Sequence, residues 1–223
     1  QYTVQVANPP YSTSWSANPK FLDDDRFSVY GKLAPKSTAD FAFVQHMIYH
    51  MAEDGRIAVL LPHGVLFRSN AEETIRKHIV KNMNYLDAVI GLPANCFQGT
   101  SIPVCCLILK RERNGNSGNI CFIDASKYYV QGKNQNSISD EDIERIVSAY
   151  AERKEIEKFC HIATMEEIEE NDYNLNIPRY VDTFEPEPEV DLQAVKESIK
   201  THKIQINILE NELQVYFLSL IHI

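Results

Sequence analysis

Residues 2–11 read Tyr-Thr-Val-Gln-Val-Ala-Asn-Pro-Pro-Tyr, a strand-like run that stops at two prolines. The run favours a short buried strand over residues 2–7, and the two prolines cannot continue its hydrogen-bonded ladder. In open α/β sheets, ligands bind beyond the carboxyl ends of the strands. We therefore expect residues 8–11 to form a functional turn at one edge of a sheet.

Helical and strand patterns alternate along the rest of the chain. Apolar residues at helical spacing predict a helix over residues 38–53, which Gly55 ends, and a second helix over 71–82. Further strands are expected at residues 57–61, 85–91, 103–110 and 120–124. This order predicts the α/β fold class, with part of a parallel, doubly wound, Rossmann-like sheet. The strands 85–91 and 103–110 are joined without a helix, so they should form an antiparallel hairpin at the edge of the sheet.

Charge divides the 223 residues into unlike parts. Residues 1–137 carry 14 Lys and Arg against 11 Asp and Glu, whereas residues 138–223 carry 8 against 20. The first part can therefore lie near phosphates, and the acidic part suits a protein partner or solvent. We expect a division into residues 1–137 with the sheet and the chemistry, 138–190 with an acidic helix and an irregular connection, and 191–223 with a long helix of near-heptad spacing. The acidic helix is expected over residues 139–153, with Ser139 as its N-cap.

Composition excludes several classes of protein. No stretch reaches the ~18 consecutive apolar residues that a membrane helix needs, and no secretory signal pattern is present. The five cysteines show no paired spacing, which favours a reduced, cytoplasmic compartment. His46 and His50 stand four residues apart on an expected helix, but no third ligand accompanies them, so we expect no metal site.

The tetrapeptide Asn8-Pro9-Pro10-Tyr11 has the groups needed to hold an exocyclic amine. The Asn8 side chain and the Pro9 carbonyl are two acceptors on a stiff backbone. Together they can accept both N–H groups of an aromatic amine, which localises its lone pair for attack on the methyl group of a sulfonium donor. The leaving group is neutral, so preorganised polar groups are sufficient and a strong base is not essential. Tyr11 offers a ring on which a planar base can stack.

Residues 8–11 resemble the catalytic motif of S-adenosylmethionine-dependent methyltransferases that act on adenine N6 in DNA. Three further blocks, residues 55–67, 91–103 and 172–180 (Asp-Tyr-Asn-Leu-Asn-Ile-Pro-Arg-Tyr), resemble the methylation subunits of type I restriction–modification systems. The resemblance covers roughly residues 3–215. It implies a methyltransferase sheet, S-adenosylmethionine as cofactor, and three partners: double-stranded DNA, a specificity subunit and a restriction subunit. The acidic part with its long helix would then dock on the specificity subunit.

The resemblance also assigns roles outside the tetrapeptide. Phe97 lies where the family has an aromatic side chain that stacks on the second face of a flipped-out adenine. Asp40 and Phe41 lie where the family lines the junction of cofactor and substrate, although Asn is commoner at the place of Asp40. The sequence lacks the family's Gly-rich cofactor turn, because its eight glycines include no G-x-G pattern. We therefore expect a C-terminal fragment, cut inside the domain at its start, that is inactive by itself.

Other interpretations stay open on the sequence alone. The chain could be a non-catalytic interaction module or relic, or a methyltransferase that modifies glutamine side chains in translation factors, where Asn-Pro-Pro-Tyr also occurs. Residues 110–113, with Lys127 and Lys133, either contact phosphates or protect a sheet edge. Residues 218–223 (Leu-Ser-Leu-Ile-His-Ile) match one reading frame of a sequencing adapter, so we expect them to be foreign and use them in no functional argument.

Overall fold

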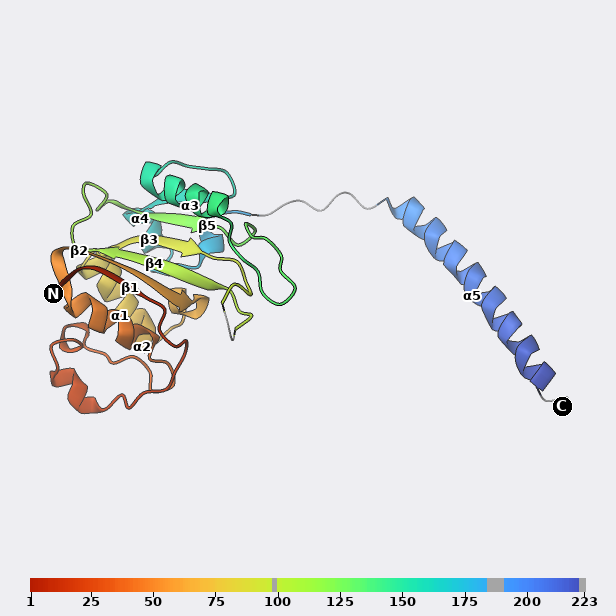
Figure 1. Cartoon of the computed structure of the whole chain (residues 1–223), viewed down its shortest axis with the longest axis horizontal. Helices are drawn as coiled ribbons and strands as arrows, with labels where there is room; N and C mark the ends of the chain where they lie inside the picture. Colours follow the sequence, from red (N-terminus) through yellow and green to blue (C-terminus); the bar gives the residue numbers. More distant parts are fainter. Residues whose placement is uncertain (98–99, 184–190, 221–223) are drawn as a thin grey trace. The chain divides into compact units, whose positions relative to one another are not determined.

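The computed structural model describes residues 1–97, 100–183 and 191–220. Within these residues, six strands form one mixed sheet in the order β1-β2-β4-β3-β5-β6 (Figure 1). The strands are β1 (Tyr2–Ala7), β2 (Met51–Pro62), β3 (Leu86–Gly91), β4 (Val104–Lys110), β5 (Asn119–Asp124) and β6 (Cys160–Thr164). β1, β2, β3 and β5 run in one direction, and β4 and β6 run against them. The expected α/β fold class is confirmed.

The hairpin of β3 and β4 is antiparallel, as the short connection predicts, with Gly91 opposite Cys105. Its expected place at the edge of the sheet is wrong, because β4 lies between β2 and β3. β4 pairs on both sides, and Leu109 faces Ile57 of β2. An apolar strand gains most in the interior of a sheet, where both of its faces are covered.

The helices cover the two faces of the sheet unequally. α1 (Asp40–Tyr49), α2 (Ala71–Lys77) and α4 (Met165–Glu170) contribute to one hydrophobic core, and α3 (Asp140–Glu152) contributes to a second. The short helical turns are η1 (Pro19–Asp23), η2 (Ser28–Tyr30), η3 (His63–Leu66), η4 (His78–Asn82) and η5 (Ile177–Arg179). α2 and η4 together fill the helix expected over 71–82. The expected helix 139–153 is confirmed as α3, and Ser139 caps it by accepting from the Asp142 N–H at 3.1 Å.

The region between α1 and β2 differs from the expectation. The helix ends at Tyr49, and the strand begins at Met51. Gly55 therefore lies within the strand and does not end the helix. A Cβ at Gly55 would lie 2.6 Å from the Met51 side chain and 2.8 Å from the Ala52 carbonyl. Glycine thus permits the register irregularity by which neighbouring β1 pairs first with Met51 and then with Arg56.

β1 is an edge strand with one uncovered face. The Gln5 amide donates to the Met47 carbonyl of α1 at 2.9 Å, so the odd-numbered side faces the helix. Tyr2, Val4 and Val6 are exposed on the other side, Val6 to 80%. The expectation of a buried strand is wrong here, because α1 covers only one face.

The structure separates residues 1–183 from residues 184–223. Residues 138–183 belong to the first unit, through α3, β6 and α4, so the boundary expected at 137 lies inside it. The second unit contains α5 (Leu192–Leu220), which confirms the long helix. No helix among the described residues is long and apolar enough to span a membrane. Residues 184–190 of the irregular connection and 221–223 of the adapter-like end lie outside the described residues.

Candidate active site

The carboxyl ends of β1, β2, β3 and β5 meet at one edge of the sheet, because these strands share a direction. The turn after β1 and the loop between β3 and β4 line a pocket of about 530 Å³ at this edge. The lining residues are Asn8, Pro9, Pro10, Tyr11, Ser12, Phe97, Thr100 and Ile102. The structure therefore brings the expected amine-binding turn and the expected stacking residue Phe97 to the same pocket.

The tetrapeptide closes on itself in this structure. The Tyr11 hydroxyl donates to the Asn8 side-chain oxygen at 2.6 Å. Burial and the nearby Cys105 raise the pKa of Tyr11, so the hydroxyl stays protonated and able to donate. Asn8 is exposed, and Pro9 and Tyr11 are half-buried. The acceptor that would receive an amine is thus accessible, and a hydroxyl that can rotate away occupies it.

Asp40 holds the residue that follows the turn. Its carboxylate is fully buried and accepts the backbone N–H of Ser12 at 2.7 Å. Ser12 has φ 46°, a left-handed backbone conformation that costs a non-glycine residue free energy unless its surroundings fix it. The hydrogen bond from Ser12 to Asp40 supplies such a fixed partner. Asp40 therefore stabilises the end of the Asn8–Tyr11 turn from the interior.

Arg68 and Glu72 complete this buried support, and sequence reasoning missed both. Arg68 Nη1 lies 3.1 Å from Asp40 Oδ2 and 3.3 Å from Glu72 Oε1. Glu72 is nearly fully buried, at 2% exposure. Burial raises the pKa of Glu72, and the charge and hydrogen bond of Arg68 offset part of that rise. The i, i+4 spacing of Arg68 and Glu72 was a visible signal, but only the fold brings the pair to Asp40.

Phe41 lies in the hydrophobic core, at 2% exposure. Neither Asp40 nor Phe41 is among the residues that line the pocket beside Asn8. Their expected place at a junction of cofactor and substrate stays a prediction. The structure adds that Asp40 binds Ser12 and Arg68, and that Phe41, the next residue of α1, packs in the hydrophobic core.

Phe97 is half-buried between the pocket and the second hydrophobic core. It forms an isolated antiparallel bridge with Thr100, whose N–H lies 3.4 Å from the Phe97 carbonyl. The side chain therefore packs partly against the protein and partly faces the pocket, as a stacking residue on a loop requires.

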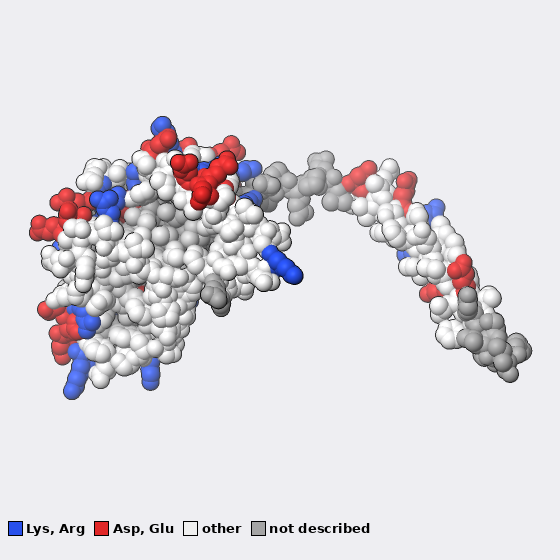
Figure 2. Space-filling view, in the orientation of Figure 1, with Lys and Arg blue, Asp and Glu red and all other residues white. Residues whose placement is uncertain are grey.

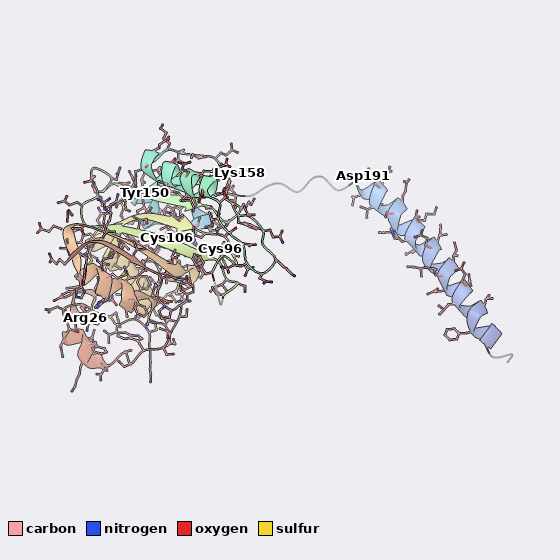
Figure 3. The ribbon with its side chains drawn as sticks, in the orientation of Figure 1. Arg26, Cys96, Cys106, Tyr150, Lys158 and Asp191 are labelled. Atoms are coloured by element: carbon pink, nitrogen blue, oxygen red, sulfur yellow. The ribbon has the colours of Figure 1, made fainter. Side chains whose placement is uncertain are left out.

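Two basic residues near the hairpin have a structural role. Lys110 Nζ lies 3.2 Å and Arg113 Nε lies 3.3 Å from the buried carboxylate of Asp87, where Arg153 also binds. Burial would raise the pKa of Asp87, but the hydrogen bond from Tyr150 and the three cations outweigh it, and the pKa is lowered. Tyr150 is labelled in Figure 3. Lys110 and Arg113 are thus committed to Asp87, and they are poor candidates for phosphate contacts.

Comparisons with known proteins show the family of the chain. Residues 1–189 match the model of the N-6 DNA Methylase family. Because this match covers most of the chain, the protein belongs to that family. The described residues contain no group of three His, Cys, Asp or Glu side chains arranged to hold a metal ion.

Two relatives and one crystal structure show which members of the family the chain is similar to. The chain is 39% identical over 200 residues to the type I restriction enzyme MpnII methylase subunit of Mycoplasma pneumoniae, covering 89% of this chain and 36% of that protein. It is 36% identical over 190 residues to the type I restriction enzyme HindI methylase subunit of Haemophilus influenzae, covering 82% of this chain and 42% of that protein. A crystal structure of a type I restriction–modification methyltransferase subunit from Streptococcus thermophilus matches with a TM-score of 0.79 at 56% identity, covering 82% and 38%. The chain thus spans about two fifths of the length of these proteins.

Proposed function

We propose that this chain forms the base-binding part of a methyltransferase that modifies adenine N6 in DNA. In this proposal, the protein is the methylation subunit of a type I restriction–modification system. The observation that carries it is a single pocket lined by Asn8, Pro9, Tyr11 and the ring of Phe97. Membership of the N-6 DNA methylase family and the names of the relatives support the same reaction.

The chemistry of the turn follows from its acceptors. The Asn8 side-chain oxygen and the Pro9 carbonyl accept the two N–H groups of the adenine amine. This arrangement draws the nitrogen towards a pyramidal shape and localises its lone pair. Tyr11 must release Asn8 when the amine arrives, because its hydroxyl occupies the same acceptor at 2.6 Å. The turn is held rigidly by Asp40, so the acceptors are in place before the base binds.

Stacking holds the base in the pocket. A base taken out of the duplex loses its stacked neighbours, and aromatic side chains replace part of that stabilisation. Tyr11 and Phe97 both line the pocket, and its volume of about 530 Å³ is within the range of small-molecule sites. Double-stranded DNA, from which the base is flipped, is therefore the proposed substrate.

S-adenosylmethionine is the proposed methyl donor, because the family uses it. It supplies a methyl group on a positively charged sulfur. The Gly-rich turn that would cradle its nucleoside is not present among the described residues, where the two glycines with positive φ, Gly31 and Gly115, lie in separate loops. The residues of this chain thus fit the base, and they do not by themselves fit the whole donor. The specificity and restriction subunits remain proposed partners of the complete protein.

The test is methyl transfer by the complete protein that carries this chain, together with its specificity subunit. Tritiated S-adenosylmethionine is supplied with unmethylated DNA or with a translation factor. We expect label in DNA, at adenine N6, and an Asn8→Ala variant that is about a hundredfold slower or worse. The variant should still assemble with its partner and bind DNA.

Other outcomes would separate the alternatives. Label in the translation factor alone would identify a protein-glutamine methyltransferase. Assembly without any methyl transfer by the unsubstituted protein would identify an interaction module. Unchanged DNA methylation by Asn8→Ala would exclude the role given to Asn8.

A further inference from the structure

A second loop lies beside the Phe97 loop at the same edge of the sheet. Residues 92–103 follow β3, and residues 125–137 follow β5, its parallel neighbour. Parallel neighbours end at the same edge, so the two loops emerge side by side (Figure 1). The loop after β5 does not line the pocket, and the site described above gives it no role.

Among the described residues, four hydrogen bonds join the two loops. The Asn136 side-chain amide donates to the Ala94 carbonyl at 2.9 Å, and the Asn136 backbone N–H donates to the Asn95 carbonyl at 2.8 Å. The Gln135 side chain donates to the carbonyl of Cys96, the residue next to Phe97 that is labelled in Figure 3. Asn95 Nδ2 donates to the Asn134 carbonyl at 3.3 Å. The contacts fall on three consecutive residues, 94–96, immediately before Phe97.

The second loop has its own internal support. Val130 and Ser137 exchange two backbone hydrogen bonds, at 2.8 and 3.0 Å, which close the segment between them. Gly132 permits this closure, because a Cβ there would lie 2.1 Å from the Gln135 carbonyl oxygen. At the base of the loop, the Tyr128 ring packs edge-on against Phe159 of the second core at 4.9 Å between centroids. The segment is therefore a closed unit anchored to the protein body.

We propose that residues 134–136 position the Phe97 loop, with Asn136 and Gln135 as the positioning residues, so that the Phe97 ring meets the flipped base. The inference rests on the proposed function, because it gives Phe97 a base to meet. The described residues of this loop, 92–97 and 100–103, form no helix or strand of the sheet, so ordering them costs conformational entropy. Two side-chain amides and the Asn136 backbone N–H bind three consecutive carbonyls, and these bonds reduce the number of conformations the loop can adopt before DNA arrives.

The first experiment measures the loop itself and does not depend on activity. Millisecond hydrogen exchange is followed at residues 92–97 in the chain and in Asn136→Ala. We expect exchange in this segment to become several times faster in the variant, because the loop opens more often. Gln131→Ala is the matched control, since Gln131 is exposed in the same loop and makes none of these four contacts. Equal exchange in Asn136→Ala and Gln131→Ala would overturn the proposal.

The second experiment uses the complete methyltransferase and its DNA. Asn136→Ala and Gln135→Ala should each lower kcat/KM for DNA about fivefold, the effect of one hydrogen bond, and leave KM for S-adenosylmethionine unchanged. In a Phe97→Ala background, Asn136→Ala should lower kcat/KM for DNA less than twofold, because the contact acts through Phe97. Full additivity of the two substitutions would overturn the proposal. Absence of methylation in the unsubstituted protein would overturn the proposed function, and the exchange experiment would still decide whether residues 134–136 hold the loop.

Discussion

The pocket has two walls that are held in different ways. The Asn8–Tyr11 turn rests on the buried carboxylate of Asp40, which binds Ser12 and pairs with the half-buried Arg68. The Phe97 loop rests on side-chain amides that are exposed to solvent. Buried charges fix one geometry strongly, because every lost partner leaves a desolvated group. Exposed amides give a weaker and more reversible support.

The difference suits the two tasks. In the proposed reaction, the acceptors of Asn8 and Pro9 must be fixed to within a fraction of an ångström, since there they act on the electrons of the amine. In the same proposal, the ring of Phe97 must let a bulky base enter and then cover it. A loop held by exposed hydrogen bonds opens at a lower cost in free energy than a turn held by a buried carboxylate. Neither wall of the pocket coincides with the acidic side chains that gather over α3 on the surface (Figure 2).

Removal of Arg68 should give the largest effect on the first wall. Arg68→Ala leaves the buried carboxylates of Asp40 and Glu72 without their cation. We expect the free energy of unfolding to fall by about 2–4 kcal/mol and methyl transfer by the complete protein to fall more than tenfold. Chemical denaturation and initial rates measure the two effects.

Two further substitutions control this prediction. Arg68→Lys keeps the charge without the planar fork and should recover part of both losses. Arg56→Ala, at an exposed position on β2, should change stability by less than about 0.5 kcal/mol. Equal effects of Arg68→Ala and Arg56→Ala would show that the cluster does not support the turn.

Removal of the Phe97 ring should affect activity more than stability. Phe97→Ala should lower kcat/KM for DNA about tenfold or more, because stacking on one base contributes about 1–3 kcal/mol. The melting temperature should fall by no more than about 4 °C, since the side chain is only half-buried. Phe97→Tyr should retain most of the activity. A large loss of stability with unchanged kcat/KM would assign Phe97 to the core.

Removal of the Tyr11 hydroxyl should have a smaller effect, in the opposite direction. In the unsubstituted protein, the Asn8 side-chain oxygen accepts from the Tyr11 hydroxyl at 2.6 Å. Tyr11→Phe keeps the ring and frees that oxygen. We expect kcat/KM for DNA to rise about two- to fivefold, the equivalent of one competing hydrogen bond. A tenfold fall would mean that the hydroxyl contacts the substrate.

The smallest predicted effect concerns the pH dependence of the buried cluster. The pKa of Glu72 is raised by burial, so the folded protein binds this proton more tightly than the unfolded chain. Stability that depends on Glu72 is therefore highest below the ordinary value of 4.5 and decreases as the pH rises through the folded pKa. Glu72→Gln should remove this decrease. Denaturation curves between pH 4 and pH 7 measure the free energy of unfolding of both proteins. The value for Glu72→Gln should increase relative to that of the unsubstituted chain as the pH rises. A difference that does not change with pH would contradict the assignment.

Several features could be read from the sequence because they are local. The prolines after residues 2–7 end a strand wherever it lies, and the Asn8 and Pro9 acceptors follow from residue type alone. The Ser139 cap and the antiparallel hairpin are also local, since they depend on residues close together in the chain. Phe97 was singled out by the resemblance to the family, and not by a local pattern. β6 and α4 were missed, because residues 160–170 mix apolar pairs with charges and show no clear period.

The sequence by itself thus determined the class of fold, the family and the chemical groups of the turn. Only the tertiary structure decided which strands are neighbours, and hence that β4 lies inside the sheet. It also decided that Asp40 meets Arg68, 28 residues away, and that Asn136 meets Ala94, 42 residues away. Residue type and spacing govern local backbone preferences, but strand pairing and buried ion pairs depend on which surfaces meet when the chain collapses. The groups proposed to act on the base were therefore visible in the sequence, and the groups that hold them in place were not.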